Sequence, residues 1–201
     1  MKQLLPIALA ALTLASAPTT FAGEPEPPAM TKRTQEAVIS SVLPFPAEQV
    51  WEAVAVDYGR IAESHPLIIR SDYRHGSLQG ELGAERTCWF NAKGTRLLHE
   101  QIVDFDDEQM VMVNRVLEAN GFPLDPDNTL GTYRIEPIDE NSSRITMEMQ
   151  FRAKPGVMTR PMVRQFEGLI SDYFIALEHH LATGEAVTQD NFEAIAKNYR
   201  D

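Results

Sequence analysis

Three polar residues that the strand pattern places on buried faces are the best candidates for chemistry in this sequence. In residues 83–90, Arg86 alternates onto the same face as Cys88 and Phe90, two residue types that prefer burial. A guanidinium on such a face requires a partner that neutralises its charge and accepts its hydrogen bonds. The following predicted strand offers Glu100 as that partner.

The register of the predicted hairpin decides whether Glu100 is within reach. A three-residue turn at residues 92–94 pairs Asn91 with Thr95 and so places Arg86 opposite Glu100. A slip of one residue would instead turn Glu100 toward solvent. We therefore expect an Arg86–Glu100 pair on the inner face of the sheet.

A second three-residue turn, at residues 106–108, extends this pair into a row. It predicts that Glu100 lies opposite Asn114, so that three inward polar residues cross three adjacent strands. Two interpretations fit such a row. Glu100 could act as general acid or base while Arg86 orients it and polarises a ligand carbonyl, or the ion pair could only fix the register of the sheet. Close pairing with Arg86 favours the ionised carboxylate, which is a weak base, and this weighs against catalysis.

His65, Tyr133 and Tyr173 are further candidates for polar contacts with a ligand. His65 precedes Pro66 near the expected mouth of a cavity, and the alternative is a loop histidine that packs on a helix. The hydroxyls of Tyr133 and Tyr173 could reach a ligand, or both could be core tyrosines with internal hydrogen-bond partners. The residues alone leave these alternatives open.

Apolar residues form the rest of the expected lining. Met112, Met147 and Met149 lie on inner strand faces, and methionine accommodates flexible apolar ligands as readily as it fills gaps in a core. Phe166 and Ile170 belong to the apolar stripe of a long C-terminal helix. The complete predicted lining is His65, Arg86, Cys88, Phe90, Glu100, Met112, Asn114, Tyr133, Met147, Met149, Phe166, Ile170 and Tyr173.

A sheet and a long helix must position these residues. Period-two alternation predicts strands at residues 37–43, 67–73, 84–91, 95–105, 109–117, 130–138 and 144–152. Pro46 begins a short helix, and a helical turn follows at residues 58–62. Pro161 begins the long helix and Gly184 ends it. The predicted fold class is α+β, a curved seven-stranded antiparallel sheet wrapped around the C-terminal helix, with two short helices after the first strand.

This order of elements resembles the helix-grip fold of the START-like (SRPBCC) superfamily, in particular its polyketide cyclase/dehydrase and plant hormone-receptor branches. The stretches that carry the resemblance are, in order, PFPAEQVWEAVAVDYGRIAESHPLI, GAERTCWF, LLHEQIVDFDDEQMVM, YRIEPI and FRAKPGVM. They fall within residues 36–183. The resemblance implies a deep apolar cavity between the sheet and the C-terminal helix, and binding of lipids, polyketides, sterols or hormones.

Three functions fit these residues, and the fold does not decide among them. The first is a carrier or sensor that binds a hydrophobic small molecule, lipid-like or polyketide-like, in an internal cavity. The second is a cyclase- or dehydratase-type enzyme that uses Glu100 as general acid or base. The third is an interaction protein whose cavity is filled by methionines, so that its acidic surface and C-terminal tail are the working parts.

We expect no metal site and no cofactor. His99 and Glu100 face opposite sides of their strand, so they cannot share a metal ion. His179 and His180 are adjacent on a helix, where their directions diverge by about 100°.

Net charge and the N-terminal sequence limit which binding partners and which cellular compartment the protein can have. The 201 residues carry a formal net charge of −11, which argues against nucleic acid and anionic membrane surfaces as partners. Residues 1–22 have the basic start, apolar run and small-residue cleavage site of a secretory signal peptide, which predicts a periplasmic or secreted protein with no integral membrane segment after cleavage. We expect a flexible proline-rich linker at residues 23–35, the ligand-binding domain at residues 36–184 and an amphipathic helical tail at residues 185–201.

Overall fold

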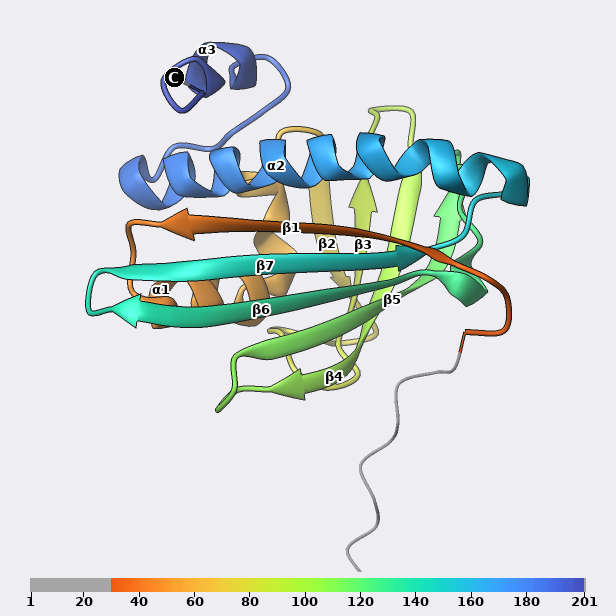
Figure 1. Cartoon of the computed structure of the whole chain (residues 1–201), viewed down its shortest axis with the longest axis horizontal. Helices are drawn as coiled ribbons and strands as arrows, with labels where there is room; N and C mark the ends of the chain where they lie inside the picture. The colour runs from red at the N-terminus through yellow and green to blue at the C-terminus, as the bar shows by residue number, and fades with distance from the viewer. Residues whose placement is uncertain (1–29, 201) are drawn as a thin grey trace, which may run out of the picture.

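The structure, a computed structural model that describes residues 30–200, is organised around one antiparallel sheet. Its seven strands lie in the order β1-β7-β6-β5-β4-β3-β2. The long helix α2 (Thr159–Thr183) packs against β1. In Figure 1, β1, β7 and β6 run almost along α2, whereas β2 and β3 stand at a steep angle to them, so the sheet curves strongly around the helix. The predicted α+β helix-grip architecture is therefore confirmed.

All seven predicted strands are present, with ends shifted by a few residues. The strands are β1 (Gln35–Leu43), β2 (Arg70–Arg74), β3 (Glu85–Trp89), β4 (Leu97–Asp106), β5 (Val111–Asn120), β6 (Leu130–Asp139) and β7 (Ser142–Phe151). The helical segments are α1 (Ala47–Trp51), η1 (Glu52–Val56), η2 (Tyr58–Glu63), η3 (Pro126–Asn128), η4 (Gly156–Met158), α2 and α3 (Phe192–Ala196).

Alternation of side chains along each strand gives the sheet one apolar face that packs on the helix. On β1, Ala37 and Leu43 are fully buried, whereas Val38 and Val42 are about half exposed. Burial of this kind stabilises the fold by roughly 25 cal/mol for each Å² of apolar surface removed from water. It also fixes the register, because a slip of one residue would expose the buried set.

The short helices after β1 bury the ring of Tyr58, which lies against the guanidinium of Arg86 on β3. Pro46, with φ of −52°, is the N-cap of α1, so the helix begins at Ala47, one residue later than predicted. The chain then continues as a single wide turn, in which the Asp57 N–H donates to the Glu52 carbonyl at 2.7 Å. The predicted turn at residues 58–62 is η2, and its first residue, Tyr58, is fully buried.

The pairing of β4 with β5 differs from the prediction. Asp106 pairs with Val111 across a longer turn than expected, and two bulges interrupt the pairing that follows. Glu100 consequently lies opposite Val116 rather than opposite Asn114, so the predicted register of that pair was wrong. At Glu100 the error is two residues, an even number, so Glu100 and Asn114 both keep their predicted inward face.

Helix α2 begins two residues earlier than predicted and ends where predicted. The Thr159 hydroxyl accepts a hydrogen bond from the Ala153 N–H at 2.9 Å, which fixes the turn into the helix. Pro161 is tolerated in the first helical turn because no backbone donor is needed there. Gly184 ends the helix with φ of 74°, a left-handed conformation that glycine adopts readily, and its N–H donates to the His180 carbonyl at 2.7 Å.

The C-terminal tail folds back over α2. The Val187 N–H donates to the Glu63 carbonyl at 2.9 Å, and Val187, Phe192 and Ile195 are buried together with Ala176 of α2. Figure 1 shows α3 on the side of α2 that faces away from the sheet. The tail thus covers the outer face of the long helix.

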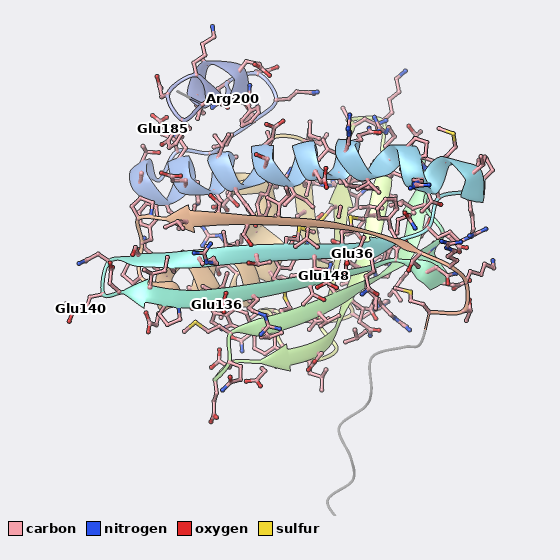
Figure 2. The ribbon with its side chains drawn as sticks, in the orientation of Figure 1. Glu36, Glu136, Glu140, Glu148, Glu185 and Arg200 are labelled. Carbon is pink, nitrogen blue, oxygen red and sulfur yellow. The ribbon has the colours of Figure 1, made fainter. Side chains whose placement is uncertain are left out.

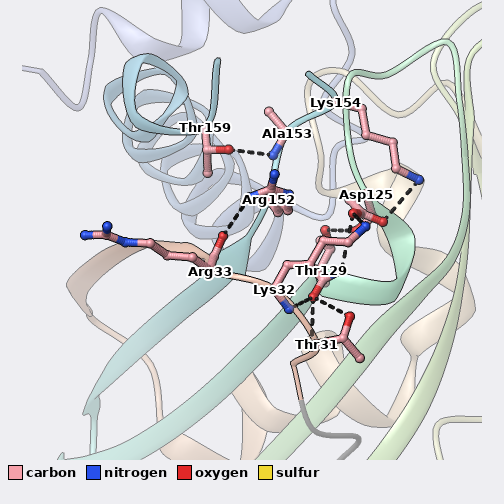
Figure 3. Close-up of polar contacts among 10 residues, drawn as sticks. Thr31, Lys32, Arg33, Asp125, Thr129, Arg152, Ala153, Lys154 and Thr159 are labelled. Atoms are coloured by element: carbon pink, nitrogen blue, oxygen red, sulfur yellow. Dashed lines mark hydrogen bonds and ion pairs between the residues drawn. The ribbon is translucent and has the colours of Figure 1, made fainter. Parts of the chain in front are cut away.

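A buried carboxylate attaches the segment before β1 to the loop between β5 and β6 (Figure 3). Asp125, with a side chain only 1% exposed, binds Lys32 at 3.3 Å and Lys154 at 3.1 Å. The Asn128 side-chain oxygen accepts from the backbone N–H groups of Thr31 and Lys32. Burial alone would raise the pKa of Asp125, but hydrogen bonds from both lysines outweigh burial and lower it.

Several glutamates lie on the outer face of the sheet. Figure 2 shows Glu36, Glu136 and Glu148 on β1, β6 and β7, and Glu140 in the turn between β6 and β7. A hydrogen bond with Glu148, burial and the charge of Glu148 together raise the pKa of Glu36. Within residues 30–200, no helix combines the length and the apolar character that a membrane span requires. The predicted signal peptide at residues 1–22 lies outside the described residues.

Candidate functional site

A cavity of about 310 Å³ lies between the inner face of the sheet and α2. Buried residues such as Arg86, Tyr133 and Ile170 form its deep end, and the exposed side chains of Arg96 and Gln165 border its open end. The complete lining is Ile61, His65, Leu67, Ile68, Arg86, Cys88, Phe90, Arg96, Leu98, Glu100, Phe122, Pro123, Leu124, Tyr133, Met147, Met149, Met162, Gln165, Phe166, Leu169, Ile170, Tyr173 and Gln189. The cavity is therefore mainly apolar, with buried polar groups at its deep end and exposed polar side chains at its open end.

The deep end contains a hydrogen-bonded ion pair. Arg86 donates from Nε to Glu100 Oε2 at 2.9 Å, and the two side chains are 3% and 12% exposed. Arg86 also donates from Nη1 to the Tyr58 carbonyl at 2.7 Å, and its guanidinium lies 3.8 Å above the centre of the Tyr58 ring. Three separate contacts thus hold the buried guanidinium in place.

The hairpin between β3 and β4 creates this pair as the sequence predicts. Arg86 is the direct cross-strand partner of Glu100. Asn114 still reaches Glu100 despite the shifted register, because its Nδ2 donates diagonally to Oε1 at 2.9 Å. The next strand makes room for this amide: a Cβ atom on Gly131 would lie only 2.7 Å from Asn114 Oδ1.

Cys88 lies beside the ion pair as an unreactive thiol. Its Sγ is 3.8 Å from Glu100 Oε2 and 3.6 Å from the Ser71 hydroxyl. Burial, which outweighs the effect of the Arg86 charge, raises the pKa of Cys88 to about 12. The sulfur therefore remains protonated and acts as a weak donor to Glu100.

His65 both packs on α2 and lines the cavity. Its ring stacks on Tyr173 with the ring centres 5.0 Å apart, and its Nδ1 accepts from the Leu67 N–H at 3.1 Å. This bond leaves the proton on Nε2 in the neutral ring. Burial, assisted by the charge of Arg86, lowers the pKa of His65 to about 3. The imidazole is thus neutral at physiological pH.

Two tyrosines complete the polar end. Tyr133 and Tyr173 both line the cavity, and burial raises the pKa of each phenol above its usual value. Both hydroxyls therefore stay protonated and can donate as well as accept a hydrogen bond. Together with His65, they offer neutral polar groups beside the charged pair.

Two of the predicted lining residues lie elsewhere. Met112 is fully buried in the core, and Asn114 lies beside Glu100, outside the cavity wall. Alternation identified the inner face of β5 correctly, but it could not show where along the strand the cavity ends. The other predicted residues lie in the wall, and their contact with a ligand stays a prediction.

The methionines line the cavity without filling it. Met147 and Met149 belong to the wall of the open space. The interpretation of a cavity filled by methionines was therefore wrong.

Sequence reasoning missed residues on α2 and in the loops. Met162 and Leu169 line the cavity and share the helical spacing of Phe166, so the periodicity could have identified them. Phe122 has no periodic signal, because it belongs to a loop. Its ring meets Phe90 edge-on at 4.8 Å, and the Arg96 guanidinium lies 4.7 Å above it.

A family model described as polyketide cyclase/dehydrase and lipid transport matches residues 34–178. No curated protein sequence matches this chain.

Solved structures share the fold over most of the chain. XoxI from Bacillus cereus is 21% identical with a TM-score of 0.61, over 74% of this chain and 96% of that protein. Major latex-like protein 151 from Panax ginseng is 15% identical with a TM-score of 0.61, over 73% and 97%. The ZhuI aromatase/cyclase from Streptomyces sp. R1128 is 13% identical with a TM-score of 0.55, over 84% and 97%. At these identities, the likeness shows the fold alone.

Proposed function

The chain belongs to the polyketide cyclase/dehydrase and lipid transport family of the START-like superfamily, and we propose that it binds a hydrophobic small molecule in its cavity as a carrier or sensor. The observation that carries this proposal is the cavity itself, about 310 Å³ with apolar walls and a charged pair at its deep end. A mostly apolar pocket with a few convergent polar groups is the usual form of a small-molecule site.

The distribution of polar groups indicates a ligand with an apolar body and one polar end. Met147, Met149 and Ile170 would contact the body, which fits a lipid-like or polyketide-like molecule. A hydroxyl or carbonyl at the other end would meet Arg86 and the Tyr133 hydroxyl. Such an arrangement would orient the ligand with its polar end inward.

Glu100 favours binding over catalysis. Its Oε2 accepts from Arg86 and Cys88, and its Oε1 accepts from Asn114. Three side chains already donate to this carboxylate and leave about one lone pair, on Oε1, for the proton that a general base would have to remove. We therefore place the carrier or sensor role ahead of a cyclase- or dehydratase-type reaction.

Export is part of the proposal. Residues 1–22 have the sequence features of a secretory signal peptide. Cys88 is the only cysteine of the chain, so no internal disulfide can form and the fold does not depend on one in an oxidising compartment.

Titration with the neutral fluorophore N-phenyl-1-naphthylamine tests the binding function. We expect saturable binding of one molecule per chain, with displacement by fatty acids or by aromatic polyketides. The affinity should be constant between about pH 6 and pH 8, because His65 stays neutral and Arg86 stays charged over that range. The absence of saturable binding, or a probe that no apolar competitor displaces, would refute the proposal.

A further inference from the structure

Two histidines and a glutamate meet on the face of the sheet that points away from the cavity. Glu85 Oε2 lies 2.8 Å from His75 Nδ1 and 2.8 Å from His99 Nε2. The three potential ligand atoms all lie within 4.8 Å of one another. None of these residues belongs to the cavity wall.

The register of β3 and β4 brings two of these residues together. Glu85 pairs with Gln101, and Thr87 pairs with His99, so Glu85 and His99 are diagonal neighbours. They lie on the opposite face from Arg86 because side chains alternate along β3. Gln101 donates from Nε2 to Glu85 Oε1 at 3.2 Å, which orients the carboxylate and leaves Oε2 to the histidines.

A tight turn after β2 brings the third residue. His75 follows the last residue of β2 and has φ of 52°, a conformation that is uncommon outside glycine. The Ser77 hydroxyl accepts from the Glu85 N–H at 3.3 Å, which holds the turn against β3. The His75 side chain is 67% exposed, so water can approach the cluster from that side.

This donor set fits a divalent transition metal. Imidazole nitrogen and carboxylate oxygen are the common protein ligands of Zn²⁺. Ligand atoms of a tetrahedral Zn²⁺ site, with bonds near 2.0–2.1 Å, are separated by about 3.3 Å. The two 2.8 Å contacts at Glu85 are close to that separation, so small side-chain movements would admit an ion.

We propose that His75, Glu85 and His99 form a binding site for a divalent transition-metal ion of the Zn²⁺ class, with water completing the coordination. The ion would replace the two hydrogen bonds that Glu85 Oε2 now accepts. Gln101 would act as an outer-shell residue that orients the ligating carboxylate. Because the exposed side is open, the site would bind the ion reversibly.

Calorimetric titration of the chelator-treated full-length protein with ZnCl₂ near neutral pH tests the proposal. We expect one Zn²⁺ per chain, and Co²⁺ should give visible absorption bands of a protein-bound ion. His75→Ala and His99→Ala should each weaken Zn²⁺ binding by at least about 100-fold, and Gln101→Leu by about 10-fold. Zn²⁺ should also raise the melting temperature of the wild type but not that of His75→Ala.

His179→Ala is the matched control, because His179, near the C-terminal end of α2, forms a histidine–carboxylate pair at 3.4 Å with Glu185, which follows the helix. This variant should bind Zn²⁺ as the wild type does. His75 is mostly exposed, so its replacement provides a folded variant even if His99→Ala is unstable. The proposal is overturned if the wild type shows no saturable Zn²⁺ binding, or if His75→Ala binds Zn²⁺ as tightly as His179→Ala does.

Discussion

Replacing Arg86 with methionine is expected to lower the free energy of unfolding by about 3–5 kcal/mol. The substitution keeps an apolar chain of similar reach but leaves Glu100 as a mostly buried carboxylate without its cation. It also leaves the Tyr58 carbonyl without the 2.7 Å bond that the guanidinium donates. Urea denaturation followed by circular dichroism measures the loss.

The matched control is Arg70→Met on the neighbouring strand β2. Arg70 also pairs with an acid, Asp72, at 3.3 Å, but these side chains are 60% and 56% exposed. Replacing Arg70 should lower the free energy of unfolding by less than about 1 kcal/mol, because solvent screens the pair. The double variant Arg86→Met with Glu100→Leu should recover most of the lost stability, since it removes both buried charges. If Arg86→Met and Arg70→Met lowered the free energy of unfolding equally, burial of the ion pair would not determine the loss of stability.

Replacing Leu169 with tryptophan is expected to weaken probe binding by more than about 100-fold, or about 2.7 kcal/mol. Leu169 lines the cavity from α2, and the larger ring would occupy part of the 310 Å³ space that a ligand needs. The fold should persist, because a side chain that fills a cavity gains packing contacts. Titration with N-phenyl-1-naphthylamine gives the affinity, and thermal unfolding reports the fold.

Gly168→Trp is the control for this substitution. Gly168 is exposed on the adjacent position of α2, and no atom lies within 4 Å of the place that its Cβ would take. The variant should bind the probe as the wild type does. If Leu169→Trp also bound the probe with wild-type affinity, the probe would have to bind outside the cavity.

The strand pattern and one short turn were sufficient to predict the centre of the site. A three-residue turn fixes the register of β3 and β4, so the pairing of Arg86 with Glu100 follows from the order of the residues alone. Asn114 was placed on the correct face but two residues out of register. The turn after β4 is longer than the three residues predicted, and a bulge in β4 then reduces the shift of the pairing to two residues. Neither feature has a clear signal in the local sequence.

The residues that escaped prediction depend on contacts between distant segments. Phe122 borders the cavity only because the loop after β5 folds back toward β3. Glu85 and His99 could have been paired from the same register as Arg86 and Glu100. His75 could not, because its position depends on a left-handed turn that a histidine adopts only rarely.

The methyl groups of the methionines test most directly whether the cavity holds a hydrophobic guest. Met147, Met149 and Met162 line the cavity, whereas Met30 and Met110 do not. Carbon-13 methyl spectra recorded with saturating N-phenyl-1-naphthylamine should show shifted signals for the first three and unchanged signals for the other two. Signals that move only for Met30 or Met110, or a spectrum that does not change at all, would contradict this account of the protein.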